Sequence, residues 1–308
     1  MGLLDRWTRA STPPAADDEL FDDDFQRKLE YLAIVSRRLF AGRLRAERRT
    51  KKTGSGIEFA DHREYAPGDD FRYLDWNVYG RTGRLLLRLY EEEEDLSIYV
   101  FVDASGSMAF GRPSKFDHAR RLAAALAYVG LANLDRVALV AGSTTVDRQM
   151  PATRGKGRIF KVFEFLRHLQ PGGDTSLEGV TRALTLQNKR RGIVIVISDL
   201  YDPEGFERGI NAIRYQKFEP IVVHVTDARE ADPGPRGDVT LYDVETGEPR
   251  DVTLTSGMVE RYRTVHAAWL RQVDDFCKSR QVPRVTADVT GAFDDQVLDL
   301  LRRLAVVG

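Results

Sequence analysis

From residue 96 onward, short apolar and β-branched runs alternate with segments whose apolar residues recur every three or four positions. This alternation is typical of a parallel sheet that is covered by helices on both faces. The expected strands are Leu96–Val102, Arg136–Ala141, Ile193–Ile197, Ile221–Val225 and Val285–Val289. The pattern therefore predicts a doubly wound, mostly parallel α/β domain over residues 96–308.

Helical spacing marks the segments between these strands. The expected helices cover residues 116–127, 159–166, 177–184, 258–276 and 293–304. In the fourth helix an apolar stripe predicts one long helix with one buried face. The stripe consists of Met258, Tyr262, Val265, Trp269, Val273 and Phe276. Two further features are an antiparallel edge strand near Thr144–Met150, which follows a tight turn, and a hairpin over Asp238–Leu254.

Charge is segregated ahead of this domain. Residues 1–24 form an acidic stretch that contains Pro13 and Pro14, and we expect a flexible tail there. Residues 27–52 hold ten basic side chains on a helical apolar pattern, which predicts an amphipathic helix that docks through residues 27–40. Together with β-like pieces at Ile57–Phe59 and Leu85–Tyr90, which predict a small β arm, this helix forms a region over residues 25–95.

Composition narrows the function classes. The chain has 308 residues, a formal net charge of −1 and one cysteine, Cys277, which excludes an internal disulfide and a cysteine-based zinc cage. No apolar run approaches the roughly 18 residues of a membrane-spanning helix, and the N-terminus lacks the pattern of a secretory signal. We therefore expect a cytoplasmic protein without a membrane span.

The candidate chemistry lies where two predicted strands end. Asp103, Ser105 and Ser107 follow the first strand, Asp199 follows the third, and Thr175 lies in a loop between them. If the two strands are neighbours, these side chains share one crevice at the carboxyl edge of the sheet. Carboxylates and hydroxyls are hard oxygen donors, which suit Mg²⁺ or Mn²⁺. Alternatively, the aspartates and serines only cap the turns and helices that follow them.

Other functions are less well supported by the residues. A phosphatase-like, Mg²⁺-dependent enzyme could use Asp103 as nucleophile, but Ser105 stands where such enzymes need a second Asp as general acid. Nucleic-acid binding through residues 27–52 has charge in its favour, but no aromatic platform or recognition motif accompanies that charge. Both readings remain alternatives to a binding module without catalytic activity.

The motif Asp103-x-Ser105-x-Ser107, with Thr175 and Asp199, resembles the metal-ion-dependent adhesion site of von Willebrand factor type A domains. The stretches Gly56–Tyr65, Pro67–Arg72, Asp75-Trp76 and Glu91–Glu94 resemble the bacterial family known as domain of unknown function fifty-eight. This family is often encoded beside MoxR-type AAA+ ATPases. The resemblance implies a metal-dependent protein-interaction module, an adaptor for such an ATPase, whose partner presents a carboxylate to the ion.

The stretches that resemble this family also have a purely structural interpretation. Five charged residues of this block form an expected brace that holds the β arm to the main domain, with Tyr65 and Trp76 packed beneath it. The five are Asp69, Asp70, Arg72, Asp75 and Arg81.

Overall fold

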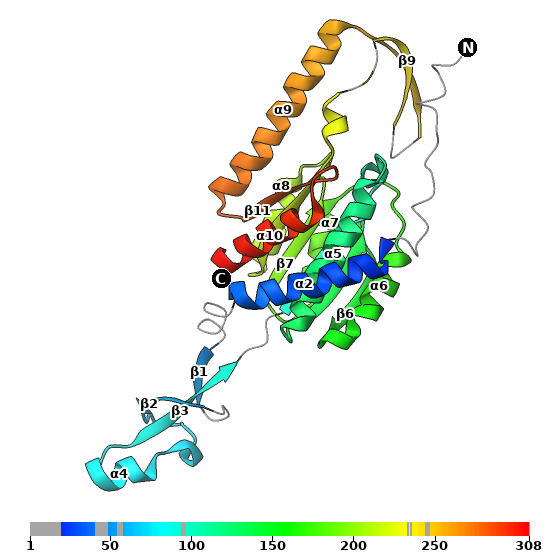
Figure 1. Ribbon diagram of the computed structural model, residues 1–308. Helices are drawn as coiled ribbons and strands as arrows, with labels where there is room; N and C mark the ends of the chain where they lie inside the picture. Colours follow the sequence, from blue (N-terminus) through cyan, green and yellow to red (C-terminus); the bar gives the residue numbers. More distant parts are fainter. Residues whose placement is uncertain are drawn as a thin grey trace.

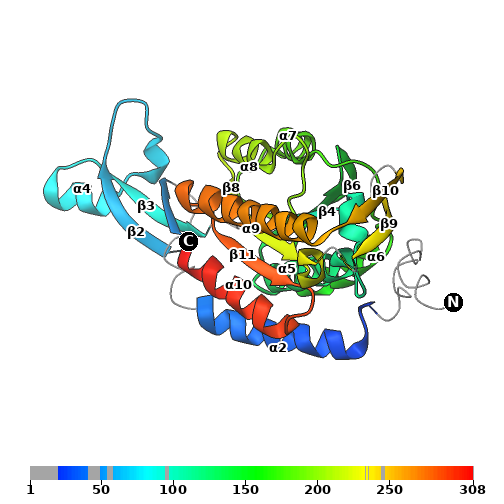
Figure 2. The ribbon, with the colours of Figure 1, turned by 90° about the horizontal axis from the view of Figure 1, so that it is seen from above.

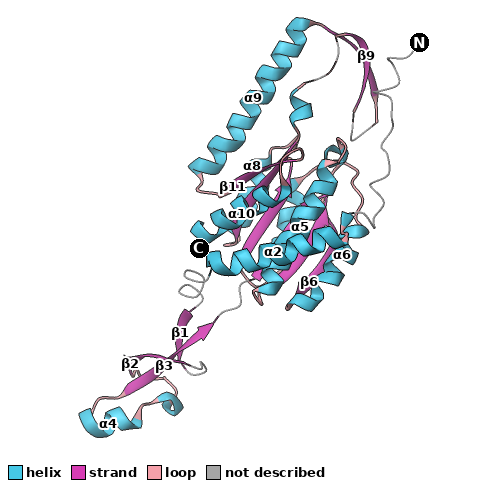
Figure 3. Cartoon of the chain, in the orientation of Figure 1, coloured by secondary structure: helices cyan, strands magenta, loops and turns pink. Residues whose placement is uncertain are grey.

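The computed structural model describes residues 20–40, 49–53, 58–93, 97–232, 234, 236–243 and 247–307. Its main domain is built on a six-stranded sheet of order β11-β8-β7-β4-β5-β6 (Figures 1 and 3). The strands are β4 (Ser97–Asp103), β5 (Arg136–Gly142), β6 (Val146–Thr153), β7 (Ile193–Ser198), β8 (Glu219–Thr226) and β11 (Arg284–Asp288). Only β6, at the edge, is antiparallel to its neighbour within this described sheet. The predicted α/β fold with a mostly parallel sheet is confirmed.

Helices cover both faces of the sheet, because successive side chains of each buried strand point to opposite sides. On β4, Val100 and Val102 join one apolar cluster, whereas Tyr99 and Phe101 join the other. The first face packs against α2 (Asp23–Phe40), α5 (Lys115–Ala132), α6 (Ile159–Arg167) and α10 (Phe293–Val307). The second packs against α7 (Leu177–Gln187), α8 (Phe206–Tyr215) and the end of α9 (Ser256–Ser279), and Figure 2 shows the two layers. The sequence patterns named no helix at α8.

The N-terminal helix is part of the main domain. Phe25, Leu29 and Leu32 of α2 are buried in the first cluster, where α2 packs against α5 and α10. The predicted docking of this helix is therefore confirmed. Leu20 and Phe21 are buried too, so the folded part begins ahead of the expected boundary at residue 24. The rest of the expected acidic tail, residues 1–19, and the basic residues 43–48 lie outside the described residues.

One prediction about α9 is wrong. Val273 and Cys277, near the end of the helix, are buried, and Trp269 and Phe276 pack against the second cluster. The first half of the predicted stripe is exposed: Met258, Tyr262 and Val265 are 45%, 41% and 60% accessible. The spacing of apolar residues shows which face of a helix can be buried. It does not show how much of that face the rest of the protein covers. In Figure 1 the start of α9 extends past the sheet toward the hairpin of β9 (Gly237–Tyr242) and β10 (Pro249–Leu254).

The β arm is a separate small unit that lies away from the main domain in Figures 1 and 3. Its three antiparallel strands have the order β1-β3-β2, where β1 is Arg49–Thr53, β2 is Glu58–Glu64 and β3 is Leu86–Glu93. A short helix, α4 (Trp76–Thr82), follows β2 along the chain. Leu74 and Leu87, which are both buried, form an isolated antiparallel backbone bridge. Neither β1 nor α4 was predicted from the sequence.

The expected brace does not join the arm to the main domain. Asp69 pairs with Arg63, Asp70 with Arg72, and Asp75 with both His62 and Arg88, all within the arm. Arg81 donates to a backbone carbonyl of α4. Trp76 is 58% exposed rather than packed beneath these charges, and Tyr65 stacks on Phe71 of the arm. These ion pairs fix the local shape of the arm, because every partner belongs to it.

Short 3-10 turns complete the described chain, at Phe71–Tyr73, Gly106–Ala109, Lys156–Arg158 and Ala228–Ala231. None of the helices in the described ranges is both long and apolar enough to cross a membrane.

Candidate metal centre

The candidate site lies where the strand order of the sheet reverses. β4 and β7 are hydrogen-bonded neighbours, and the chain continues from β4 to β5 on one side and from β7 to β8 on the other, so the connections after these two strands run in opposite directions. Asp103 is the last residue of β4, and Asp199 directly follows the last residue of β7. Both aspartates therefore stand at the carboxyl ends of adjacent strands, the usual position of ligand sites in open α/β sheets. The two strands are thus neighbours, which is the condition for a shared site.

Two backbone hydrogen bonds bring the third loop to the same place. Gly106 donates to the Gly173 carbonyl at 3.0 Å, and Gly172 donates to the Ala104 carbonyl at 2.8 Å. These bonds hold the loop that leads to Thr175 against the loop of Asp103 to Ser107. All five predicted residues are buried, as the exposed fractions show: Asp103 0%, Ser105 0%, Ser107 8%, Thr175 5% and Asp199 1%.

Helix capping does not account for this arrangement. Ser105 precedes the short turn at Gly106–Ala109 without a capping hydrogen bond from its side chain, and Gly205 precedes α8. The Ser105 hydroxyl instead lies 3.1 Å from that of Ser107. Asp199 accepts a bond from the Tyr201 amide at 3.2 Å, a local turn rather than a helix cap. Asp103 likewise accepts from the Ser105 amide, so each aspartate caps a local turn, as the alternative interpretation expected, but neither caps a helix.

Asp103 is a fully buried carboxylate without a cationic partner in the described part of the chain. Its Oδ1 accepts from the Ser105 amide at 2.9 Å, and its Oδ2 accepts from the Ser198 hydroxyl at 2.5 Å. Burial and the negative charge of Asp199 raise the pKa of Asp103 to about 7, against its ordinary 3.8. A positive charge next to Asp103 would offset both the burial of the carboxylate and its repulsion by Asp199.

Asp199, by contrast, has a built-in cation. The Lys115 ammonium, on a side chain that is 0% exposed, donates to Asp199 Oδ2 at 2.6 Å and also to Glu230. It lies 5.0 Å from the centre of the Tyr201 ring and 5.8 Å from that of Phe110. Although burial opposes the charge, Asp199 and Glu230 raise the pKa of Lys115, so the lysine stays protonated. Lys115 thus neutralises one carboxylate of the pair and leaves the other.

The donor set fits a hard divalent cation. Two carboxylates and three hydroxyls lie in the loops at one edge of the sheet, and these are the kinds of oxygen ligand that Mg²⁺ and Mn²⁺ take. No group of three or more His, Cys, Asp or Glu side chains within the described ranges is arranged to hold a metal ion. The predicted set contains only two such residues, so its remaining donors would be the hydroxyls of Ser105, Ser107 and Thr175, and water.

Sequence reasoning missed Lys115, Glu230 and the role of Ser198. Lys115 is the first residue of α5, and Ser114 caps this helix. A cation is unfavourable there because the helix dipole is positive at its N-terminus. A lysine at that position was the available signal of a nearby negative charge. Its partners lie 84 and 115 positions away, so no local pattern could identify them.

Two solved structures have a similar arrangement of the chain. A BatB protein from Bacteroides thetaiotaomicron has a TM-score of 0.43 and 16% identity, over 68% of this chain and 98% of that one. An aerotolerance-related membrane protein from Bacteroides fragilis has the same TM-score and 17% identity, over 68% and 99%.

Among sequences, the uncharacterized protein Rv1480 of Mycobacterium tuberculosis is 27% identical over 262 residues, which cover 83% of this chain and 82% of the relative. The uncharacterized protein MAV169 of Mycobacterium avium is 31% identical over 104 residues, 34% of this chain and 61% of that protein. The model of DUF58, a protein family of unknown function, matches residues 61–271. The match covers the β arm from residue 61 onward, both candidate aspartates and most of the sheet, and the chain belongs to the DUF58 family.

Proposed function

We propose that this protein is a non-enzymatic, metal-dependent protein-interaction module with a site like that of von Willebrand factor type A domains. Asp103, Ser105, Ser107, Thr175 and Asp199 would hold the ion. Mg²⁺ or Mn²⁺ would supply a positive charge and an exchangeable coordination position for a carboxylate of the partner.

The observation that carries this proposal is the pair of buried carboxylates on neighbouring strands. A buried charge is costly unless it is paired, and Asp103 has only hydroxyl and amide donors in the described part of the chain. Its raised pKa, about 7, means that a proton takes the place of a cation near neutrality when no metal is bound. A group in this condition favours exchange of the proton for a dication.

Lys115 gives the site a way to respond to the ion. Its ammonium contacts both Asp199 and Glu230, so the lysine retains a carboxylate partner when Asp199 turns toward a metal. Glu230 belongs to the turn at Ala228–Ala231, and Tyr262 of α9 donates to its backbone carbonyl at 2.7 Å. Ion binding at Asp199 would therefore also affect this turn and the start of α9.

The partner class follows from charge and from family resemblance. An aspartate or glutamate of the partner is the natural occupant of an open position on Mg²⁺. A MoxR-type AAA+ ATPase, or a client that this protein presents to it, is the partner that the resemblance suggests. In that role the protein acts as an adaptor.

The test is capture of partners from the native host by the wild type and by Asp103→Ala, in Mg²⁺ and in EDTA. We expect a partner that the wild type retains in Mg²⁺ and that is lost in EDTA or with Asp103→Ala. Asp70→Ala on the arm is the matched control and should behave like the wild type. Circular dichroism verifies equal folding. A specific partner that all samples bind equally in EDTA would contradict the proposal.

A further inference from the structure

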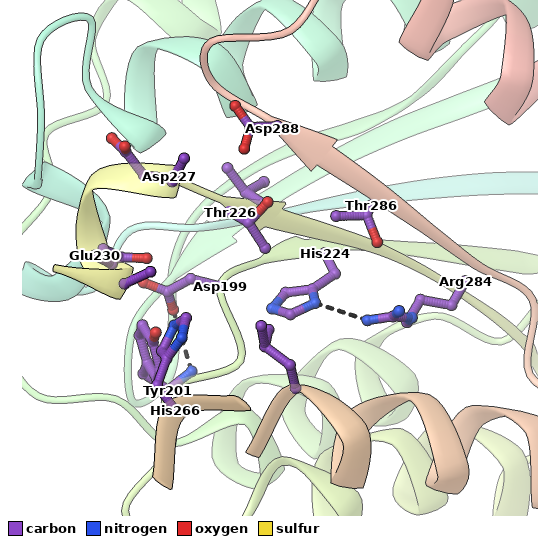
Figure 4. Close-up of a pocket in the computed structure, with 14 residues that line it drawn as sticks. Asp199, Tyr201, His224, Thr226, Asp227, Glu230, His266, Arg284, Thr286 and Asp288 are labelled. Atoms are coloured by element: carbon purple, nitrogen blue, oxygen red, sulfur yellow. Dashed lines mark hydrogen bonds between the residues drawn. The ribbon is translucent and has the colours of Figure 1, made fainter. Parts of the chain in front are cut away.

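A cavity of about 260 Å³ lies beside the candidate metal centre, between the carboxyl ends of β7, β8 and β11 and the helix α9 (Figure 4). Asp199 lines one side of it, but most of the wall comes from elements that the metal site does not use. Its polar groups include His224 of β8 and Asp288 of β11, and Leu270 and Ala231 contribute apolar surface. The cavity is therefore a mixed polar and apolar pocket of small-molecule size.

His224 directs an unsatisfied donor into this cavity. The side chain is 0% exposed, and its Nδ1 lies 3.0 Å from Arg284 Nη1. A guanidinium can only donate, so Nδ1 accepts and the ring proton resides on Nε2. Burial and Arg284 lower the pKa of His224 to about 3, which keeps the ring neutral. Nε2 is buried and makes no hydrogen bond of good geometry among the described residues, with the Asp199 backbone close to the ring. Such a donor is costly unless a ligand satisfies it.

Asp288 supplies a hydrogen-bond acceptor with a negative charge to the same cavity. Its Oδ1 accepts from the Thr290 amide at 2.7 Å and from the Thr290 hydroxyl, whereas Oδ2 has no partner and the residue no ion pair within the described ranges. The other acidic side chains of the wall are already paired. Asp199 and Glu230 contact Lys115, and Asp227 contacts Arg229. Asp288 is thus the acidic side chain of the wall that has no ion pair among the described residues, with Arg229 as the nearby cation, and it lies at a different place in the cavity from the His224 donor (Figure 4).

We propose that this cavity binds a small zwitterion, with a carboxylate on His224 Nε2–H beside Arg284 and an ammonium group on Asp288. Arg284 also contacts Asp274 at 3.4 Å and still brings a positive charge to the histidine end, which favours an anionic acceptor there. Leu270 and Ala231 suit a short aliphatic linker. The ligand needs no metal, so this inference goes beyond the proposed function and does not depend on it.

The experiment is calorimetric titration of the full chain in EDTA with β-alanine, 4-aminobutanoate and 6-aminohexanoate. These zwitterions differ only in the distance between their charged ends. Hexanoate and hexylamine carry one end each. We expect saturable binding of at least one zwitterion and binding at least about tenfold weaker for both one-ended compounds, because one charge-assisted hydrogen bond is lost. No saturable binding of any zwitterion at millimolar concentrations would overturn the proposal, as would equal binding of the one-ended compounds.

Variants locate the binding site. His224→Phe and Asp288→Asn should each weaken binding of the zwitterion about tenfold or more. His224→Gln should restore part of it, because a glutamine amide can accept from Arg284 and still donate into the cavity. Asp251→Asn on the hairpin is the matched control and should bind like the wild type. If His224→Phe does not fold, the ¹⁵N resonance of His224 Nε2 in the wild type gives the answer. A shift on titration supports the site, and an unchanged resonance at saturation contradicts it.

Discussion

The β arm and the sheet edge at Asp199 both contain clusters of ion pairs, but the two clusters differ in burial. In the arm, Arg72 and Asp70 are 81% and 40% exposed. At the sheet edge, Lys115 and Asp199 are 0% and 1% exposed. Water screens the first pair, whereas the second interacts at low dielectric and has no other source of solvation. The comparison shows that burial, and not the number of ion pairs, separates the charges that are costly to remove from those that are not.

The largest expected effect is that of Lys115→Met. Removal of the ammonium leaves Asp199 and Glu230 buried without their cation, and we expect a loss of about 3–5 kcal/mol in the free energy of unfolding in EDTA. Mg²⁺ should recover part of this loss, because a dication can replace the missing charge. Urea unfolding with and without Mg²⁺ measures both the loss of stability and its recovery. A variant as stable as the wild type in EDTA would mean that the buried pair is not formed.

The two halves of α9 provide the next comparison. Val273→Ala creates a cavity in the second apolar cluster and should cost about 1–3 kcal/mol. Val265→Ala, on the same helix but 60% exposed, should stay within about 0.5 kcal/mol of the wild type. Chemical denaturation of the two variants checks the difference. Equal losses would show that the exposed half of the stripe is covered in solution.

The pH dependence of the metal-free protein should reveal Asp103. Its pKa is raised from 3.8 to about 7 in the folded state, so the folded protein retains a proton that the unfolded chain releases. Between these two values stability should fall as pH rises, by at most about 1.4 kcal/mol per pH unit. Below about pH 4 both states are protonated, and the contribution is fully present.

Urea unfolding in EDTA across this pH range measures the slope, and Asp103→Asn is the control because asparagine does not titrate. An identical pH dependence in the variant would contradict the assignment. Mg²⁺ should stabilise the wild type more above about pH 7 than at acidic pH, because the proton and the ion compete for one carboxylate.

The smallest expected effect is in the arm. Arg72→Met removes an exposed pair whose two partners both belong to the arm, and the urea midpoint should not change measurably. A clear fall in that midpoint would show that the arm ion pairs support the whole fold after all.

Sequence reasoning reached the sheet and the two aspartates for definite reasons. The apolar runs of β4 and β7 identify fully buried strands, and the resemblance to von Willebrand factor type A domains implied that those strands lie side by side. It failed where contacts are distant. Glu230 lies 115 positions from Lys115, so no pattern links them. It failed also for Trp76 and the start of α9, because an apolar residue shows what a side chain can bury and not whether a surface faces it.

The most direct measurement is titration of the metal-free protein with Mn²⁺, with the free ion followed by electron paramagnetic resonance. If Asp103, Ser105, Ser107, Thr175 and Asp199 hold the cation, the wild type binds one equivalent and Mg²⁺ competes for it. Asp103→Ala then binds none, Ser105→Ala and Thr175→Ala bind more weakly, and Asp251→Asn binds like the wild type. Equal binding of Mn²⁺ by the wild type and Asp103→Ala, or no binding by the wild type, would contradict the metal centre.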